Sequence, residues 1–285
     1  MGKVILMFIV LIFEISGIAN IYLQYPTYPL SIIFFDVGQG DSVLIETSNK
    51  IKILIDTGPD SRIVEKMAST SKIIDNKIDY VILTHPDMDH IGGMVGLLEN
   101  FEIKNIIFNF DFSIDSKYID ELSQSINNEN ANIIKGFDSS DMYIDDCYFD
   151  FIWPKNEQNS QTSLSENDSS ISIKISYKGF DLFLGGDISI DIENIIGNDI
   201  NEIEVMKLSH HGSNTSNGLE FLELLSPEYA IISVGKNNKY NHPAKNVINN
   251  LEIEKIKYFR TDTEGDIECK VKDNVDYSCF SLQYL

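Results

Sequence analysis

Four side chains that can bind metal ions lie within six residues of this chain, in His85-Pro86-Asp87-Met88-Asp89-His90. Imidazole suits zinc and other borderline cations, whereas carboxylate suits harder ions such as manganese. The spacing H-x-D-x-D-H predicts two adjacent sites, one formed by His85 and Asp87 and the other by Asp89 and His90. The alternative, an acidic loop with two solvated histidines, is disfavoured because such a cluster is uncommon without a role in a site.

The chain has five histidines, and each lies beside Gly, Pro, Ser or Asp near the end of an apolar stretch. Besides the two in the motif, His210 and His211 are adjacent, and His242 precedes Pro243. Binding and catalytic residues are found disproportionately on loops that a rigid scaffold positions. We therefore expect these three histidines to lie at the same site as the motif.

The composition is that of an ordinary globular protein of 285 residues, with 43% hydrophobic and 11% aromatic residues, and it permits one large domain or two small ones. The 44 acidic and 22 basic residues give a formal net charge of −22. This charge favours solubility and opposes binding to nucleic acid or anionic lipid unless cations or local basic residues intervene. It argues against a nonspecific DNA-binding module.

Three cysteines, Cys147, Cys269 and Cys279, are too few and too widely spaced for a disulfide framework or a zinc ribbon. Cys269 and Cys279 could bridge neighbouring strands of a terminal hairpin, but we interpret them as buried thiols. None of the cysteines is near a histidine motif in the sequence, so a Cys/His nucleophile is unsupported.

The N-terminus combines Lys3 with ten consecutive apolar residues, 4–13, followed after Glu14 by small residues that end at Ala19. This pattern predicts a secretory signal peptide cleaved after Ala19, or else an uncleaved anchor tilted through the bilayer. A first core strand fits poorly because the run does not alternate. We expect an extracellular or cell-surface membrane-anchored protein, with residues 1–25 outside the fold and residues 26–285 forming the domain.

The elements that must position the histidines are short strands and helices. Strands are expected at 31–36, 42–46, 51–56, 80–83, 147–153, 170–177, 180–184, 204–208, 229–234, 257–260 and 267–271. Helices are expected at 60–68, 92–99, 117–127, 190–196, 219–225 and 244–251. This alternation predicts a layered α/β protein with two sheet-helix halves, and we interpret the polar tract 156–167 as a surface loop between them.

From residue 31 to the C-terminus, the chain resembles the metallo-β-lactamase fold superfamily, and within it the hydrolase domain of ComEC-type competence proteins. That branch reads H-x-D-x-D-H where the broader superfamily reads H-x-H-x-D-H. Further motifs match in the expected order: Phe35-Asp36-Val37-Gly38-Gln39-Gly40-Asp41-Ser42, Leu54-Ile55-Asp56-Thr57-Gly58, Asn167-Asp168-Ser169-Ser170, Leu184-Gly185-Gly186-Asp187-Ile188, His210-His211-Gly212-Ser213, Tyr240-Asn241-His242-Pro243 and Arg260-Thr261-Asp262. The resemblance implies an α/β fold, the four-layer αβ/βα sandwich with two mixed sheets, and a site at the edge where the sheets meet.

The resemblance also implies two metal positions that share the carboxylate of Asp187. The residues that match the family's ligands are His85 and Asp87 at one position, and Asp89, His90 and one of His210 or His211 at the other. We favour His211 as the ligand and His210 as a contact to phosphate, although strand alternation does not fix the choice. Asp89, His210 and His242 are the predicted catalytic residues.

Three further residues are expected beside the ligands. Asp36 is predicted to accept a hydrogen bond from a ligand histidine, or alternatively to form a strand-end turn. The superfamily commonly supplies another histidine before the bridging Asp, and Asn167 or Ser170 occupies that region here. The first position is therefore poorer in imidazole, so manganese competes with zinc and the site holds one ion or two.

His242 is not needed to complete either metal position. Its predicted role is a contact to the scissile phosphate or the leaving oxygen. The alternative is a turn before a helix that begins near Pro243, because His-Pro is also an ordinary helix entry.

The expected activity is metal-dependent hydrolysis of a phosphodiester, in which a water between the ions acts as hydroxide. The resemblance makes a nuclease acting on DNA the leading hypothesis. Because the only basic residues near His242 are Lys236, Lys239 and Lys245, a phosphocholine esterase of the same fold is an alternative. A noncatalytic partner module of a DNA-uptake system is a further alternative, disfavoured because the ligands are intact. We expect no obligate protein partner, and membrane association only through the N-terminus.

Overall fold

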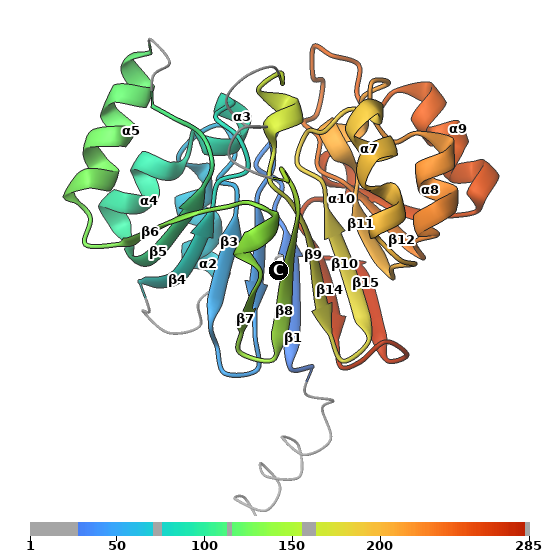
Figure 1. The fold of residues 1–285 in the computed structure, drawn as a ribbon, viewed down its shortest axis with the longest axis horizontal. Coiled ribbons are helices and arrows are strands. Elements are labelled where there is room, and N and C mark those ends of the chain that lie inside the picture. The colour runs from blue at the N-terminus through green and yellow to red at the C-terminus, as the bar shows by residue number, and fades with distance from the viewer. Residues whose placement is uncertain (1–27, 71–75, 113–115, 156–163, 283–285) are drawn as a thin grey trace, which may run out of the picture.

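The computed structural model describes residues 28–70, 76–112, 116–155 and 164–282. The predictions for residues 1–25 and for most of the tract 156–167 lie outside the described residues. Two β-sheets occupy the centre of the molecule, and helices cover the outer face of each (Figure 1).

The first sheet has eight strands in the order β15-β14-β1-β2-β3-β4-β5-β6. They are β1 (Leu30–Phe34), β2 (Val43–Glu46), β3 (Lys52–Ile55), β4 (Lys77–Ile82), β5 (Glu102–Phe108), β6 (Asn132–Lys135), β14 (Ile267–Val271) and β15 (Tyr277–Ser281). The sheet is mixed, because β1 pairs antiparallel with β2 and β14 whereas β3 to β6 are parallel. Its helices are α2 (Arg62–Thr70), α3 (Met88–Ile91), α4 (Met94–Asn100) and α5 (Lys117–Asn128).

The second sheet has seven strands in the order β13-β12-β11-β10-β9-β8-β7. They are β7 (Met142–Ile144), β8 (Cys147–Trp153), β9 (Ser172–Tyr177), β10 (Phe180–Leu184), β11 (Val205–Lys207), β12 (Tyr229–Ile232) and β13 (Lys257–Arg260). This sheet is also mixed, with β10 to β13 parallel and β7 to β10 antiparallel. Its helices are α7 (Ile190–Ile196), α8 (Leu219–Leu225) and α9 (Lys245–Glu254), and the short α10 (Thr261–Glu264) follows β13.

Three apolar clusters hold these layers together. One cluster lies between the sheets and includes Phe34 of β1 and Phe149 of β8. The other two fix the helices: Leu122 of α5 packs into the cluster on the first sheet, and Leu222 of α8 packs into the cluster on the second. Such burial of the apolar stripe of each helix is the main source of its stability. The predicted four-layer sandwich with two mixed sheets is confirmed.

Two details differ from the expectations. The helix expected at 92–99 is preceded by α3, so the metal motif itself begins a helical turn. The strands β5, β6 and β7 were not predicted, and Asn132–Lys135 of β6 is largely exposed, which leaves no alternation of buried and exposed residues to detect.

The interpretation of Cys269 and Cys279 as thiols is wrong. The two residues are direct partners in the antiparallel pair of β14 and β15, and they form a disulfide. Side chains directly opposite each other on antiparallel strands are close enough for this bond. Cys147 is free and buried. Among the helices of the described ranges, none has both the length and the apolar character needed to cross a bilayer.

Candidate metal centre

The residues of the candidate site lie in the loops and short helical turns that follow four strands, two in each sheet. His85, Asp89 and His90 follow β4, and Asp56 follows β3. Asp187 follows β10, and the pair His210 and His211 follows β11 in the other sheet. Because parallel strands end at the same edge of a sheet, the sandwich brings these loops together where the sheets meet (Figure 1).

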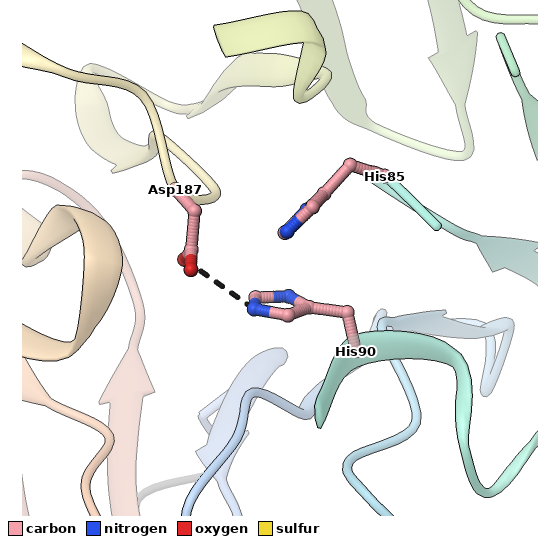
Figure 2. A group of neighbouring side chains, drawn as sticks. All are labelled: His85, His90 and Asp187. Atoms are coloured by element: carbon pink, nitrogen blue, oxygen red, sulfur yellow. Dashed lines mark ion pairs between the residues drawn. The ribbon is translucent and has the colours of Figure 1, made fainter. Parts of the chain in front are cut away.

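The first cluster of possible ligands consists of His85, His90 and Asp187 (Figure 2). One ligand atom of each residue lies within 4.8 Å of the other two, and all three residues are buried. Nε2 of His90 is 3.3 Å from Oδ1 of Asp187, and the centroids of the two histidine rings are 4.1 Å apart. The motif that follows β4 and the aspartate that follows β10 thus meet where the two sheets come together.

The second cluster consists of Asp89, His90 and His211, again with one atom of each within 4.8 Å of the others. Nε2 of His211 is 3.1 Å from Oδ2 of Asp89 and 3.6 Å from Oδ2 of Asp187. Asp187 therefore has one carboxylate oxygen near His90 and the other near His211. This is the arrangement that a bridging carboxylate requires.

The proton on the His85 ring can be placed from its neighbours. Nδ1 of His85 is 3.1 Å from the Thr84 hydroxyl and 3.2 Å from the Ser170 hydroxyl. The Thr84 hydroxyl donates to Asp56, and the Ser170 hydroxyl donates to the carbonyl of Asn167. Each hydroxyl has a single proton, so both must accept from Nδ1–H of His85. Nε2 of His85 is left with the free lone pair that a metal ligand needs.

Asp56 performs the same role for His90. Its Oδ2 atom lies 2.7 Å from Nδ1 of His90, while its carboxylate also accepts from the amide and hydroxyl of Thr84 at 2.8 and 2.7 Å. Burial, partly opposed by His90, raises the pKa of Asp56. Sequence reasoning did not select Asp56 as a site residue. The signal was an aspartate directly after the apolar strand β3, in one of the motifs already matched.

His211 is held by a third set of acceptors. Its Nδ1 is 2.9 Å from the carbonyl of Ser233 and 3.2 Å from Oδ1 of Asp41. Burial alone would lower the pKa of His211, but the carboxylates of Asp187 and Asp41 raise it to about 10. All three histidines thus present Nε2 to the centre, with Nδ1 bound to the protein. This is the usual arrangement of metal-binding imidazoles.

His210 and His211 do not alternate like strand residues. Both have left-handed backbone conformations, with φ of 51° and 55°. This turn directs His211 into the buried cluster, whereas the His210 side chain is 28% exposed and its Nε2 lies 3.8 Å from Asp187. The geometry therefore favours His211 as a ligand. It places His210 at the rim of the site, where the buried cluster meets solvent.

A buried ion pair lies next to the candidate ligand His211. The ammonium group of Lys207, on β11, contacts Oδ2 of Asp41, and both side chains are almost fully buried. Burial would raise the pKa of Asp41, but Lys207 and His211 lower it, so this carboxylate is ionised. Sequence analysis did not identify either residue as part of the site. A lysine on a strand gives no signal until its burial is known.

Three residues that the sequence analysis assigned to the site, Asp36, Asn167 and Asp87, do not belong to either cluster of possible ligands. The Asp36 carboxylate accepts from the amide of Gly38 at 3.1 Å, which is the turn-forming alternative, and Asp56 instead binds a ligand histidine. Asn167 lies with Nδ2 3.4 Å from Nε2 of His210. The Asp87 carboxylate is 3.8 Å from Nε2 of His85, and burial together with Glu166 raises the pKa of Asp87 to about 6.

His242 lies outside both clusters. Its ring centroid is 5.9 Å from that of His210, and its ring stacks on Tyr240. Burial lowers the pKa of His242. It is therefore placed next to the rim histidine, where a contact to a bound group is possible.

The donor set fits divalent metal ions. Nε2 of His85, Nε2 of His90 and Oδ1 of Asp187 are buried and make no hydrogen bond to any of the described residues. Buried polar atoms are normally satisfied, so three that converge on one point indicate a missing partner. Imidazole nitrogens mixed with carboxylate oxygens suit divalent ions such as zinc or manganese.

Comparison with known proteins gives one family. A model of the metallo-beta-lactamase superfamily matches residues 35–115. The chain is 32% identical over 261 residues to "ComE operon protein 3" of Bacillus subtilis (strain 168), a match that covers 84% of this chain and 33% of that protein. It is 29% identical over 252 residues to "Competence protein ComA" of Neisseria gonorrhoeae, a match that covers 85% of this chain and 32% of that protein. The chain spans about a third of the length of these relatives.

The fold is shared with a solved structure of much lower sequence similarity. The metallo-beta-lactamase fold protein YhfI from Bacillus subtilis superimposes with a TM-score of 0.58 at 10% identity. The match covers 84% of this chain and 99% of that one. This similarity bears on the fold alone.

Proposed function

Because this chain belongs to the metallo-β-lactamase superfamily, and within it to the ComEC-like branch of competence proteins, we propose that it hydrolyses phosphodiester bonds in a metal-dependent reaction, with DNA as the substrate. The observation that carries the proposal is the orientation of three histidines. His85, His90 and His211 each bind a protein acceptor through Nδ1 and direct Nε2 toward Asp187. Ligands fixed in this way are preorganised for metal binding.

Two metal positions are proposed. Asp89, His90, His211 and Asp187 form one position, which has two imidazoles and two carboxylates. His85 and Asp187 form the other, with Asp87 at its edge. The position that includes His85 is poorer in ligands, so it binds its ion more weakly and favours a harder ion such as manganese.

Bound divalent ions would neutralise a phosphate and lower the pKa of water at the site. The protein contributes the surrounding charges and contacts. Asp187 connects the two positions, while His210 at the rim lies 3.8 Å from Asp187 and is 28% exposed. Burial lowers the pKa of His210, so its neutral ring can hydrogen-bond to a substrate oxygen as donor or acceptor. His242, 5.9 Å from His210 between ring centroids, would contact the phosphate or the leaving oxygen.

The DNA substrate is proposed from the competence relatives, and so is a role at the cell envelope. The matches cover about a third of each competence protein named above, so the proposal concerns only the activity of the matched region. A signal peptide or anchor in residues 1–25 stays a prediction.

The test is hydrolysis by the purified full chain with zinc or manganese added. The substrates are single-stranded DNA, bis-p-nitrophenyl phosphate and p-nitrophenyl phosphocholine. We expect turnover of the first two and its loss in Asp187→Asn, whereas Asp120→Asn, an exposed change on α5, serves as the matched control. No turnover of any phosphoester with either metal would refute the proposal. Turnover of the phosphocholine ester alone would replace the nuclease by a phosphocholine esterase.

A further inference from the structure

A groove opens onto the candidate metal centre from the side of the loop that follows β12. It is lined by Gln39, Pro59, Met88, Asp89, Asn238, Lys239 and Tyr240. Asp89 is also a candidate ligand, so this residue lines both the groove and a metal position. Two large apolar side chains in the lining are exposed, Met88 at 47% and Tyr240 at 52%. Both side chains line the same groove as Asp89.

The loop that carries Tyr240 is held in a single arrangement by Asn238. The Asn238 side chain donates to the carbonyls of Gly235 and His242 at 3.1 and 2.8 Å. Its Oδ1 accepts from the amides of Tyr240 and His242 at 3.2 and 2.9 Å. An amide that makes four bonds to its own loop fixes the backbone on both sides of Tyr240. The aromatic ring is therefore presented by an ordered turn, which reduces the entropic cost of binding.

The Tyr240 ring has two neighbours of different chemistry. The His242 ring stacks on it with centroids 5.7 Å apart and an angle of 15° between planes. The Lys239 ammonium lies 4.9 Å from the Tyr240 centroid. Lys239 is exposed, and a cation over a solvent-exposed ring is held weakly. It can move to a phosphate without breaking a buried contact.

We propose that Tyr240 is a platform on which an unpaired nucleobase stacks next to the scissile phosphate, with Lys239 binding a backbone phosphate. The inference rests on the proposed phosphodiesterase function and narrows its substrate to single-stranded nucleic acid. A base in a duplex has both faces covered by its neighbours, so only an unpaired base can lie on the ring. Stacking on aromatic side chains is strong and tolerates any base, so the platform would accept a single strand of any sequence.

The competing occupant of an exposed tyrosine is a quaternary ammonium group, which aromatic faces bind through cation–π contacts. The Lys239 ammonium disfavours a quaternary ammonium group at this ring, because it is already next to the ring and the two positive charges repel each other. Lys236 is exposed on the same loop and adds to the local positive charge. Within a chain of net charge −22, these cations make this rim suitable for a polyanion.

The test compares two esters that share a leaving group. One is the p-nitrophenyl ester of thymidine 5′-monophosphate, and the other is methyl p-nitrophenyl phosphate, which has no base. For the full chain with manganese, we expect kcat/KM to favour the thymidine ester by at least about fivefold. Tyr240→Ala should remove this preference, Tyr240→Phe should retain it, and Tyr143→Ala, a change of an exposed side chain on β7, should leave it unchanged.

A binding measurement gives a second readout that does not require turnover. Fluorescence anisotropy of labelled oligothymidylate should show weaker binding by Tyr240→Ala, whereas an abasic oligomer with the same number of phosphates should bind both proteins equally. A base preference that survives Tyr240→Ala refutes the platform while leaving the phosphodiesterase intact. A wild-type chain that hydrolyses neither ester refutes the proposed function, and the anisotropy result still decides the role of Tyr240. An effect of Tyr240→Ala confined to p-nitrophenyl phosphocholine assigns the ring to the quaternary ammonium and overturns the inference.

Discussion

Nδ1 of His90 lies 2.7 Å from Oδ2 of Asp56, although the two residues are separated by 34 positions and belong to different loops. The same carboxylate binds the amide of Thr84, whose hydroxyl faces the ring of His85. Asp56 therefore connects the orientations of two candidate ligands. Thr57 also joins the two segments, because its amide and its hydroxyl both donate to the carbonyl of His90, at 2.6 and 2.9 Å.

From this relationship we predict that Asp56→Asn weakens metal binding by about 10- to 100-fold, because His90 loses the charged acceptor that fixes its ring. The measurement is calorimetric titration of the apoprotein with zinc and with manganese. Asp120→Asn on the surface of α5 should bind as the wild type does. An unchanged affinity in Asp56→Asn would show that His90 is not a ligand.

Ser170→Ala should weaken binding less, by about tenfold, and only at the position that includes His85. The reason is that the Thr84 hydroxyl still accepts from Nδ1 of His85 when Ser170 is removed. Metal stoichiometry measured by elemental analysis after dialysis should fall from two toward one. A loss of both ions would mean that the two positions cannot be filled independently.

The sequence predicted the bounds of a helix or strand well where a run of buried apolar residues is flanked by glycine or by residues that begin or end a helix. β10 (Phe180–Leu184) and α8 (Leu219–Leu225) have the predicted bounds. The choice between His210 and His211 could not be predicted, because it depends on a left-handed turn rather than on strand alternation. Asp56 was not predicted to hold a ligand histidine, because Asp36 also follows an apolar strand and only the packing of the loops distinguishes the two residues.

Lys207→Met should destabilise the protein by about 3 to 5 kcal/mol, because it removes the ammonium group that contacts Oδ2 of Asp41 and leaves His211 as the nearest basic side chain beside this buried carboxylate. The measurement is the free energy of unfolding in urea, carried out without added metal. The double variant Lys207→Met with Asp41→Leu should recover much of the loss, since it removes the buried carboxylate as well. Additive losses in the double variant would contradict the view that the two groups form an ion pair.

Glu193 predicts a pH dependence of stability that is separate from the metal ligands. Burial raises the pKa of Glu193 to about 7 from 4.5, even though the amides of Asn217 and Gly218 donate to its carboxylate. Because the folded pKa is raised, this contribution to stability is fully present below pH 4.5 and is lost as the pH rises through about 7. Glu193→Gln cannot titrate, so the wild type should lose roughly 3 kcal/mol relative to it between these pH values. Parallel pH profiles of the two unfolding free energies would exclude this effect.

The two adjacent histidines should separate metal binding from turnover. His211→Ala removes a buried imidazole 3.1 Å from Asp89, and we expect at least tenfold weaker metal binding together with loss of activity. His210→Ala removes a rim side chain, so its metal affinity should stay within about twofold of the wild type while kcat falls by about 100-fold. The comparison requires calorimetry and steady-state kinetics on bis-p-nitrophenyl phosphate at saturating metal. If His210→Ala also loses the metal, both rings are ligands, and the left-handed turn at Ser209–Gly212 holds two ligands rather than separating a ligand from a substrate contact.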